Sequence, residues 1–126
     1  MTTAPCVLLV DDQRDIVRLL HSTLQTLGHK LDIVDAPSGE EALLAASRRK
    51  VDLLVADYLL PGISGVELMR KIKVRNPDMK VIFMSGYTDD AVVRHGVLSS
   101  ELEFVHKPLL PGSLLEKLRR VLDKHG

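Results

Sequence analysis

The sequence predicts an α/β domain in which a five-stranded parallel sheet is covered by helices on both faces, in a doubly wound (βα)5 arrangement. Five short apolar runs recur along the chain, and segments with apolar residues three and four positions apart separate them. Strands that alternate with helices pair in parallel, because each return to the sheet needs a crossover, and such crossovers are right-handed. A length of 126 residues fits one domain, which we expect to span residues 1–126.

Each apolar run predicts one strand of the sheet. The first, third and fourth runs are almost continuously apolar, which indicates strands that are buried on both faces. The second run contains Asp32, which an edge strand tolerates. The five predicted strands are Cys6–Val10, Leu31–Val34, Val51–Ala56, Lys80–Met84 and Leu102–Val105.

The helices are predicted by their apolar spacing and by signals at their ends. Three of them begin with a serine that is followed three residues later by a glutamate, the signature of a capping box. Glycine and an asparagine-proline pair predict where the first and third helices end, and the fourth helix carries an internal Gly96. The capping boxes are Ser38 with Glu41, Ser64 with Glu67, and Ser113 with Glu116. The helix stops are Gly28 and Asn76-Pro77, and the fourth helix is predicted over Asp89–Leu98.

Composition excludes several classes of function. Lys plus Arg and Asp plus Glu both total 17, so no overall charge draws the chain to nucleic acid or to an anionic membrane. The longest apolar runs are far too short to cross a bilayer, and the amino terminus does not have the pattern of a secretion signal. Cys6 is the single cysteine, so an internal disulfide is excluded. We expect Cys6 to be a small buried apolar residue of the first strand. We therefore expect a cytoplasmic protein with no membrane partner and no direct contact with nucleic acid.

The chemistry is expected where the strands end, because ligands of open parallel sheets bind beyond the carboxyl ends of the strands. Polar residues stand at four of these ends, and Asp35 at the end of the second strand is not distinguished from an ordinary surface acid. The four sets are Asp11-Asp12 after the first strand, Asp57 after the third, Ser85-Gly86 after the fourth, and Lys107-Pro108 after the fifth.

Three carboxylates at one sheet edge repel one another unless a cation lies among them. Oxygen ligands suit Mg²⁺ or Mn²⁺, whereas zinc sites favour histidine and cysteine. The lysine and the hydroxyl nearby are groups that bind phosphoryl oxygens. The residues therefore predict a phosphoryl site, in which one carboxylate can itself be the nucleophile and form an aspartyl phosphate.

The chain resembles the receiver domain of two-component response regulators over essentially its whole length. The resemblance implies a flavodoxin-like topology with the strand order 2-1-3-4-5 and a function as a phosphorylated signalling switch. It is carried by Val10-Asp11-Asp12, by Asp57 with Leu60-Pro61-Gly62-Ile63-Ser64-Gly65, by Met84-Ser85-Gly86-Tyr87, and by Phe104-Val105-His106-Lys107-Pro108.

By this resemblance, Asp57 accepts a phosphoryl group from the phosphohistidine of a histidine kinase or phosphotransfer protein. Mg²⁺, or Mn²⁺ in its place, is held by Asp12, Asp57 and the backbone carbonyl of Leu59, and Asp11 assists directly or through water. Such a domain is not an enzyme for a separate substrate, because it catalyses phosphotransfer only onto its own aspartate.

The resemblance also implies how the signal leaves the site. Ser85 and Lys107 bind the phosphoryl group, and Phe104 changes rotamer together with Ser85. The surface that switches comprises the fourth helix, the fifth strand and the fifth helix, and it binds a downstream protein or a covalently attached domain. Residues 83–98 resemble receivers attached to hybrid histidine kinases, so the chain is either a separate regulator or part of such a kinase.

The sequence departs from the family pattern at several positions. Leu59 and Tyr87 flank the path of the hydrolytic water, so we hypothesise slow dephosphorylation that Leu59→Asn accelerates. Gln13 stands where an acidic residue is common in the family, and this change is expected to weaken the outer shell of residues around the metal ion. Leu110 stands at the usual helix cap but cannot cap, so the fifth helix is expected to begin later, capped by Ser113.

Three alternatives remain open. A pseudo-receiver has the same fold but is never phosphorylated, and the presence of Asp57, Asp12, Ser85 and Lys107 argues against it. A phosphohydrolase with an aspartate nucleophile needs a second aspartate where this chain has Leu59. A flavin-binding electron carrier is disfavoured by the few aromatic residues and by carboxylates where a phosphate would bind.

Overall fold

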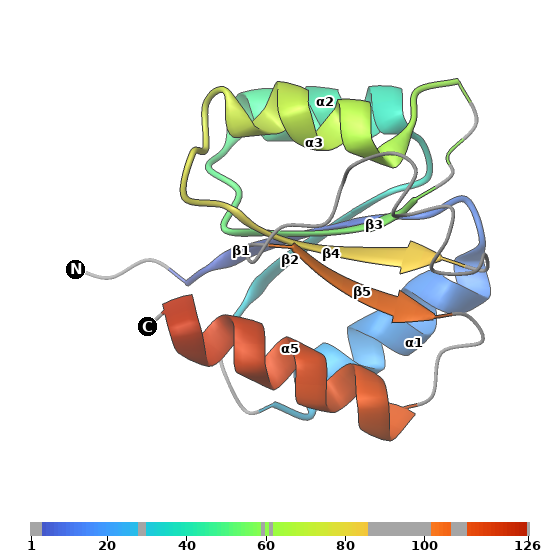
Figure 1. The fold of residues 1–126 in the computed structure, drawn as a ribbon, viewed down its shortest axis with the longest axis vertical. Coiled ribbons are helices and arrows are strands. Elements are labelled where there is room, and N and C mark those ends of the chain that lie inside the picture. The colour runs from blue at the N-terminus through green and yellow to red at the C-terminus, as the bar shows by residue number, and fades with distance from the viewer. Residues whose placement is uncertain are drawn as a thin grey trace.

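A parallel sheet of five strands forms the centre of the computed structural model, which describes residues 4–27, 30–58, 60, 62–85, 102–106 and 111–125. The strands follow the order β2-β1-β3-β4-β5, and all four neighbouring pairs are parallel (Figure 1). The fold class and the strand order expected from the sequence are therefore confirmed. The strands are β1 (Cys6–Val10), β2 (Asp32–Ala36), β3 (Leu53–Asp57), β4 (Lys80–Ser85) and β5 (Leu102–His106).

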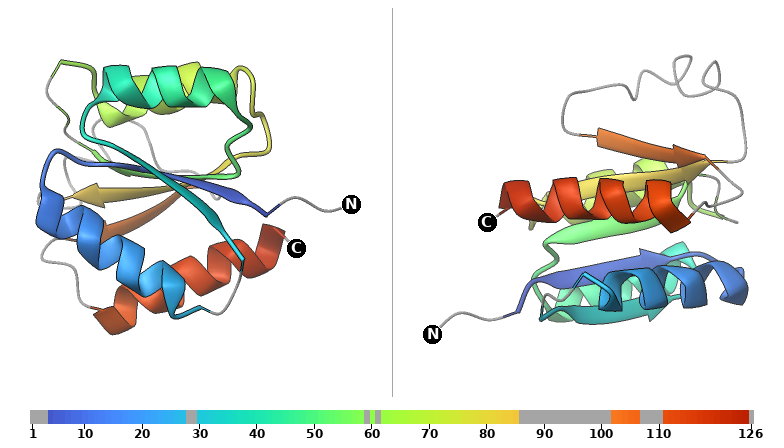
Figure 2. Two further views of the ribbon diagram at one scale, coloured as in Figure 1. Left: turned by 180° about the vertical axis from the view of Figure 1, so that it is seen from behind. Right: turned by 90° about the horizontal axis from the view of Figure 1, so that it is seen from below.

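Helices cover both faces of the sheet. Of the helices in the described residues, two pack together on one face and two on the other, as the views in Figures 1 and 2 show. None of the helices in the described residues has the length and apolar character needed to cross a membrane. The first face carries α1 (Arg14–Gln25) and α5 (Pro111–His125), and the second carries α2 (Gly39–Arg48) and α3 (Gly65–Lys73).

The core is divided by the sheet into two clusters, and alternate strand residues contribute to each. Val7 and Leu9 pack with residues of α1 and α5, whereas Leu8 and Val10 pack with residues of α2 and α3. All five residues of β1 are buried, as are the first four of β3, which confirms the prediction of strands covered on both faces. β2 lies at the edge of the sheet, and its residues are mostly partly or fully exposed.

The third strand begins two residues later than the sequence predicts. Val51 is buried, which explains its strand-like appearance, but its backbone N–H donates to the side-chain oxygen of Asn76 at 3.0 Å. The side chain of Asn76 thus accepts the hydrogen bond that a carbonyl of a neighbouring strand would otherwise accept from Val51. The second strand is also displaced, from the predicted Leu31–Val34 to Asp32–Ala36.

The helix starts agree with two of the three predicted caps. Ser38 accepts a hydrogen bond from the N–H of Glu41 at 3.2 Å, and Ser64 accepts one from Glu67 at 3.1 Å. The prediction that Ser113 caps the fifth helix is wrong, because α5 begins at Pro111 and Ser113 lies inside its first turn. Proline suits that position, since its φ is already helical and its missing N–H needs no partner there.

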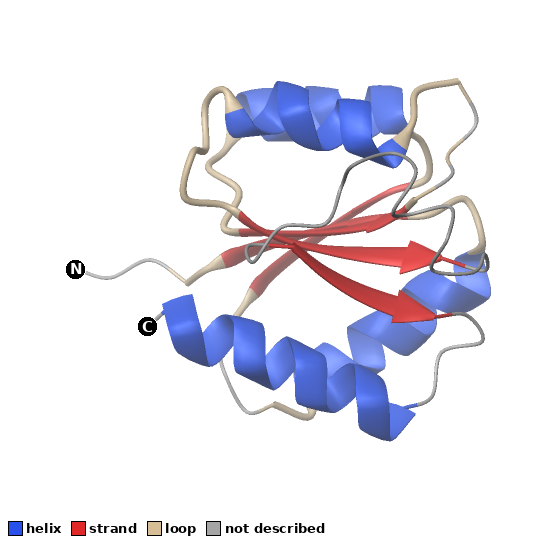
Figure 3. Cartoon of the chain, viewed as in Figure 1, coloured by secondary structure: helices blue, strands red, loops and turns tan. Residues whose placement is uncertain are grey.

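Several predicted features lie outside the described residues. They include the fourth helix over Asp89–Leu98, the helix stop at Gly28, and the sequence departures at Leu59, Tyr87 and Leu110. The strands that are described all end on the same side of the sheet (Figure 3). Residues that directly follow neighbouring strands are therefore brought close together at that edge.

Candidate functional site

Three aspartates meet at the edge where the strands end. β1 and β3 are neighbours and pair through Val10 and Ala56, so the residues that follow, Asp11 and Asp57, leave the sheet side by side. One carboxylate oxygen from each of Asp11, Asp12 and Asp57 lies within 4.8 Å of the others. The structure thus brings together the three carboxylates that the sequence predicts to share a site.

Backbone N–H groups and burial hold the innermost carboxylate in place. Asp11 is only 2% exposed, and its Oδ1 accepts a hydrogen bond from the backbone N–H of Gln13 at 2.8 Å. The backbone N–H of Asp11 donates to the carbonyl of Ala36 on the neighbouring strand at 3.3 Å. Asp57 is partly buried and Asp12 is exposed. The cluster is therefore anchored at Asp11 and open to solvent at Asp12.

This donor set fits a hard divalent cation. The cluster supplies only carboxylate oxygens, and it contains neither the imidazole nor the thiolate groups that zinc favours. Three negative charges in such proximity are stabilised by a cation between them. The cluster can therefore hold Mg²⁺ or Mn²⁺.

The remaining predicted residues belong to β4 and β5 or directly follow strands. Asp57 pairs with Met84 of β4, so Ser85, the next residue and the last of that strand, belongs to the same sheet edge. Phe104 lies in the middle of β5, where it pairs with Phe83. Lys107, which directly follows β5, and Leu59 lie outside the described residues.

The turn that follows Asp57 is fixed by contacts with β4 and α3. The backbone N–H of Tyr58 donates to the carbonyl of Met84 at 2.8 Å, and that of Gly65 donates to the carbonyl of Tyr58 at 3.1 Å. The rings of Tyr58 and Phe83 meet edge to face, with centroids 5.8 Å apart. Burial raises the pKa of the Tyr58 hydroxyl above its ordinary value. These contacts hold the backbone next to Asp57 in one position.

A hollow of about 530 Å³ opens beside the aspartate cluster, between α1 and the end of β2. Arg14, Arg18 and His21 line it from α1, at the spacing of one helix face. The sequence analysis did not identify these three residues as lining a common hollow. The available signal was Arg14, a cation at the first residue of a helix, where the helix dipole disfavours positive charge.

Comparison with known families and proteins is consistent with this geometry. A family model described as response regulator receiver domain matches residues 7–119. The chain is 38% identical over 121 residues to the transcriptional activator protein ExaE of Pseudomonas putida, which covers 95% of this chain. It is 35% identical over 121 residues to the sensor kinase CckA of Brucella abortus, which covers 94% of this chain.

The chain spans only part of these curated relatives, 56% of the first and 12% of the second. Among solved structures, the chemotaxis response regulator CheY4 of Vibrio cholerae superposes with a TM-score of 0.81 at 26% identity, covering 94% of this chain and 99% of that one. A two component transcriptional regulator from Clostridium phytofermentans superposes with a TM-score of 0.84 at 27% identity, covering 95% and 94%. From the family match and the fold, the chain belongs to the response regulator receiver domains.

Proposed function

We propose that this receiver domain is a phosphoacceptor that takes a phosphoryl group onto Asp57 from the phosphohistidine of a histidine kinase or phosphotransfer protein. The observation that carries the proposal is the cluster of Asp11, Asp12 and Asp57, whose carboxylate oxygens lie within 4.8 Å of one another. A cation between the three carboxylates would relieve their repulsion, which supports a site where a metal ion and a phosphoryl group meet.

The residues that would hold Mg²⁺, or Mn²⁺ in its place, are Asp12, Asp57 and the backbone carbonyl of Leu59, with Asp11 assisting directly or through water. When bound, the ion neutralises negative charge on phosphoryl oxygens. Asp11 is suited to its role because burial and the N–H of Gln13 fix its carboxylate before any ligand arrives. Asp12 is suited to its role because it is exposed to the incoming group.

In the proposed transfer, an Asp57 carboxylate oxygen forms a bond to phosphorus while the phosphorus–nitrogen bond of the donor breaks. The electron pair of that bond returns to the donor imidazole, and the product is an acyl phosphate on Asp57. Ser85 and Lys107 bind the other phosphoryl oxygens. Ser85 ends the strand that pairs with Asp57, which supports a role close to the acceptor.

Phosphorylation would then switch a binding surface. Ser85 moves toward the phosphoryl group and Phe104 changes rotamer, which alters the face formed by the fourth helix, β5 and α5. The partner on that face is a downstream protein or a covalently attached domain in the cytoplasm. The relatives named as a transcriptional activator and as a sensor kinase are both longer than this chain, which supports the arrangement with an attached domain.

The proposal is tested by measuring the intact mass of the protein after incubation with acetyl phosphate, with and without Mg²⁺. We expect a single phosphoryl adduct that requires the ion and is lost in Asp57→Asn. Asp35→Asn is the matched control, because Asp35 belongs to the adjacent strand β2 and is not part of the three-aspartate cluster. It should be phosphorylated as the unmodified protein is.

Because some receivers accept only from a phosphoprotein, the same assay is repeated with a phosphorylated histidine phosphotransfer domain as donor. An adduct that survives Asp57→Asn would contradict the assignment of the acceptor. The absence of any adduct from both donors, together with no detectable binding of Mg²⁺, would favour a pseudo-receiver instead.

A further inference from the structure

A small groove lies between α2 and α3, on the opposite face of the sheet from α1 and α5. It has a volume of about 200 Å³, and its apolar floor is formed by Leu43, Ala46 and Ile72. Ala46 and Ile72 are buried, whereas Leu43 is partly exposed. Two cations, Lys71 and Arg75, line the same groove, and both are exposed.

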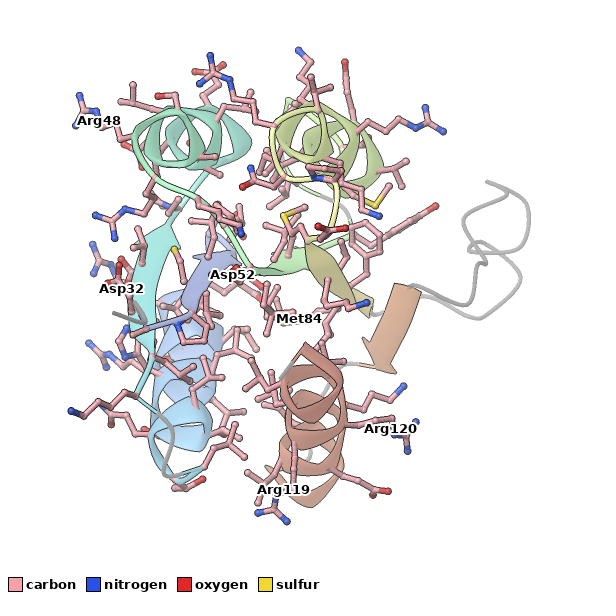
Figure 4. The ribbon with its side chains drawn as sticks, turned by 90° about the vertical axis from the view of Figure 1, so that its left-hand side faces the viewer. Asp32, Arg48, Asp52, Met84, Arg119 and Arg120 are labelled. Atoms are coloured by element: carbon pink, nitrogen blue, oxygen red, sulfur yellow. The ribbon has the colours of Figure 1, made fainter. Side chains whose placement is uncertain are left out.

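The surroundings of the groove are strongly basic. Residues 47–50, at the end of α2, and residues 70–76, at the end of α3, contain seven lysines and arginines and no acidic residue. Arg49, one of these seven cations, forms an ion pair with Asp32 of β2, whereas Lys71 and Arg75 line the groove itself. Figure 4 looks onto the side where the strands begin, and Arg48 points away from the body of the protein there.

Stabilisation of the helix ends accounts for Arg48, in the last turn of α2, and for Arg70, Lys71 and Lys73, in the last turn of α3, but not for Arg75. A cation in the last turn of a helix interacts favourably with its dipole, but the effect is confined to that turn. Arg75 lies beyond the end of α3 at Lys73, and it flanks an apolar floor. Val74, between these cations, is 82% exposed, and Leu44 on α2 is 55% exposed. Among the described residues, they are the large apolar side chains that remain most open to solvent.

We propose that this groove binds an acidic segment of a partner protein, one aliphatic side chain of which enters between α2 and α3. The apolar floor takes the aliphatic side chain, and Lys71 and Arg75 pair with carboxylates on either side of it. Val74, the exposed neighbour of Arg75 in the chain, offers a further apolar contact. This surface is separate from the aspartate cluster, so the inference does not depend on the proposed phosphotransfer.

The dimensions and chemistry of the groove favour this occupant over others. A volume of about 200 Å³ is below the roughly 300–1,000 Å³ that is usual for small-molecule pockets, but it can accept one side chain. Proteins that bind single-stranded nucleic acid stack the bases on aromatic side chains, and the groove has none. Charge complementarity therefore points to carboxylates, and the apolar floor points to a peptide that also carries a hydrophobic anchor.

The test uses fluorescein-labelled peptides of glutamate and alanine with one central residue that is leucine, isoleucine, methionine or serine. Binding to the full chain is measured by fluorescence anisotropy at low and physiological salt. We expect saturable binding of at least one aliphatic peptide and at least fivefold weaker binding of the serine peptide. Lys71→Glu/Arg75→Glu should weaken the binding at least tenfold, and Val74→Asp should weaken it several-fold.

Arg119→Glu/Arg120→Glu is the matched control, because it makes the same change in charge on α5, on the other face of the sheet (Figure 4). At physiological salt, where long-range effects of charge are largely screened, this control should leave the affinity within about twofold. All three variants should keep the circular dichroism spectrum of the unmodified protein, which shows that they fold.

Three outcomes would overturn the proposal. If the serine peptide binds as well as the aliphatic ones, the surface recognises charge alone. If single-stranded DNA, heparin or anionic lipid vesicles bind more tightly than any of the peptides, the partner has a different chemistry. If no peptide in the set binds saturably, the groove is not a docking site for acidic segments.

Discussion

Gly65 lies directly against the backbone of Asp57. A β-carbon built on Gly65 would be 2.6 Å from the carbonyl oxygen of Asp57 and 3.1 Å from both the ring of Phe83 and the Cα of Tyr58. The first distance is far shorter than the carbon–oxygen contacts of relaxed structures, so no side chain fits between the two backbones as they stand. The start of α3 and the proposed phosphoacceptor are therefore packed as one unit.

Gly65→Ala should consequently destabilise the fold and slow the phosphorylation of Asp57. Relief of the clash requires a shift of β3 or α3, and such overpacking costs about 1–3 kcal/mol. The free energy of unfolding in urea and the rate of adduct formation measure the two effects. Gly112→Ala in the first turn of α5 is the control, because a β-carbon there meets nothing within 4 Å. If both variants behave alike, the contact with Asp57 is not what matters.

Asn76 connects the end of α3 to the start of β3. Its side-chain oxygen accepts from the N–H of Val51 at 3.0 Å, and its amide nitrogen donates to the carbonyl of Ile72 at 3.1 Å. The residue is 4% exposed, so Asn76→Ala leaves a buried N–H without its partner. We expect a loss of about 2 kcal/mol in the free energy of unfolding.

The control for Asn76 is Ser47→Ala, which removes a hydrogen bond from the exposed Ser47 hydroxyl to the carbonyl of Leu44. A surface change of this kind should alter stability by less than about 0.5 kcal/mol. Equal effects of the two variants in urea unfolding would contradict the bridging role of Asn76.

Much of this architecture could be predicted from the sequence because it depends on periodic patterns. The burial of β1 and β3 on both faces follows from their continuous apolar runs, and the meeting of Asp11 with Asp57 follows from the parallel order of these strands. The end of α3 shows where this reasoning stops: Asn76 reads as a helix stop, whereas its bond to Val51 joins residues 25 positions apart. The groove between α2 and α3 likewise depends on how two helices pack side by side, which no local pattern encodes.

The start of α5 shows a second limit, where two local signals compete. Ser113 and Glu116 have the spacing of a capping box, and Pro111 is equally suited to the first turn of a helix. The structure follows the proline, since α5 begins there. Both signals are worth only about 1 kcal/mol, so the packing of the helix on the sheet decides between them.

Cys6 should react slowly with alkylating reagents in the folded protein. It is 5% exposed, and its thiol pKa is raised, first by burial and then by the negative charge of Asp32, with Arg49 opposing the shift. The thiolate that reacts is therefore scarce at neutral pH. Intact mass after treatment with iodoacetamide at pH 8 should show much slower labelling than in urea, and equal rates would contradict this.

The same shift predicts how stability depends on pH. Because the Cys6 thiol has a higher pKa in the folded state than in the unfolded state, it contributes to the free energy of unfolding while it is protonated. Below the ordinary thiol value of about 8.5 this contribution is constant, and it is lost as the pH rises further. Unfolding free energies between pH 7 and pH 10 should therefore fall more steeply for the unmodified protein than for Cys6→Ala.

Mg²⁺ should stabilise the fold, because the three aspartates repel one another without it. If the ion binds only the folded state and its concentration is ten times its dissociation constant, it adds about 1.4 kcal/mol to the free energy of unfolding. We expect the midpoint of thermal unfolding to rise with the concentration of Mg²⁺. In Asp12→Asn the rise should be largely lost, and without the ion this variant should unfold at the same temperature or higher, since one repelling charge is gone.

The ion's effect on the cluster has to be separated from general screening of surface charge. Each measurement is therefore paired with a sodium chloride solution of equal ionic strength, in which the midpoint should change little. Asp35→Asn removes a carboxylate of the adjacent strand and should keep the full response to Mg²⁺. If Asp12→Asn also keeps it, the ion binds somewhere other than the aspartate cluster, and phosphorylation of Asp57 would then have to proceed without a metal held by Asp12.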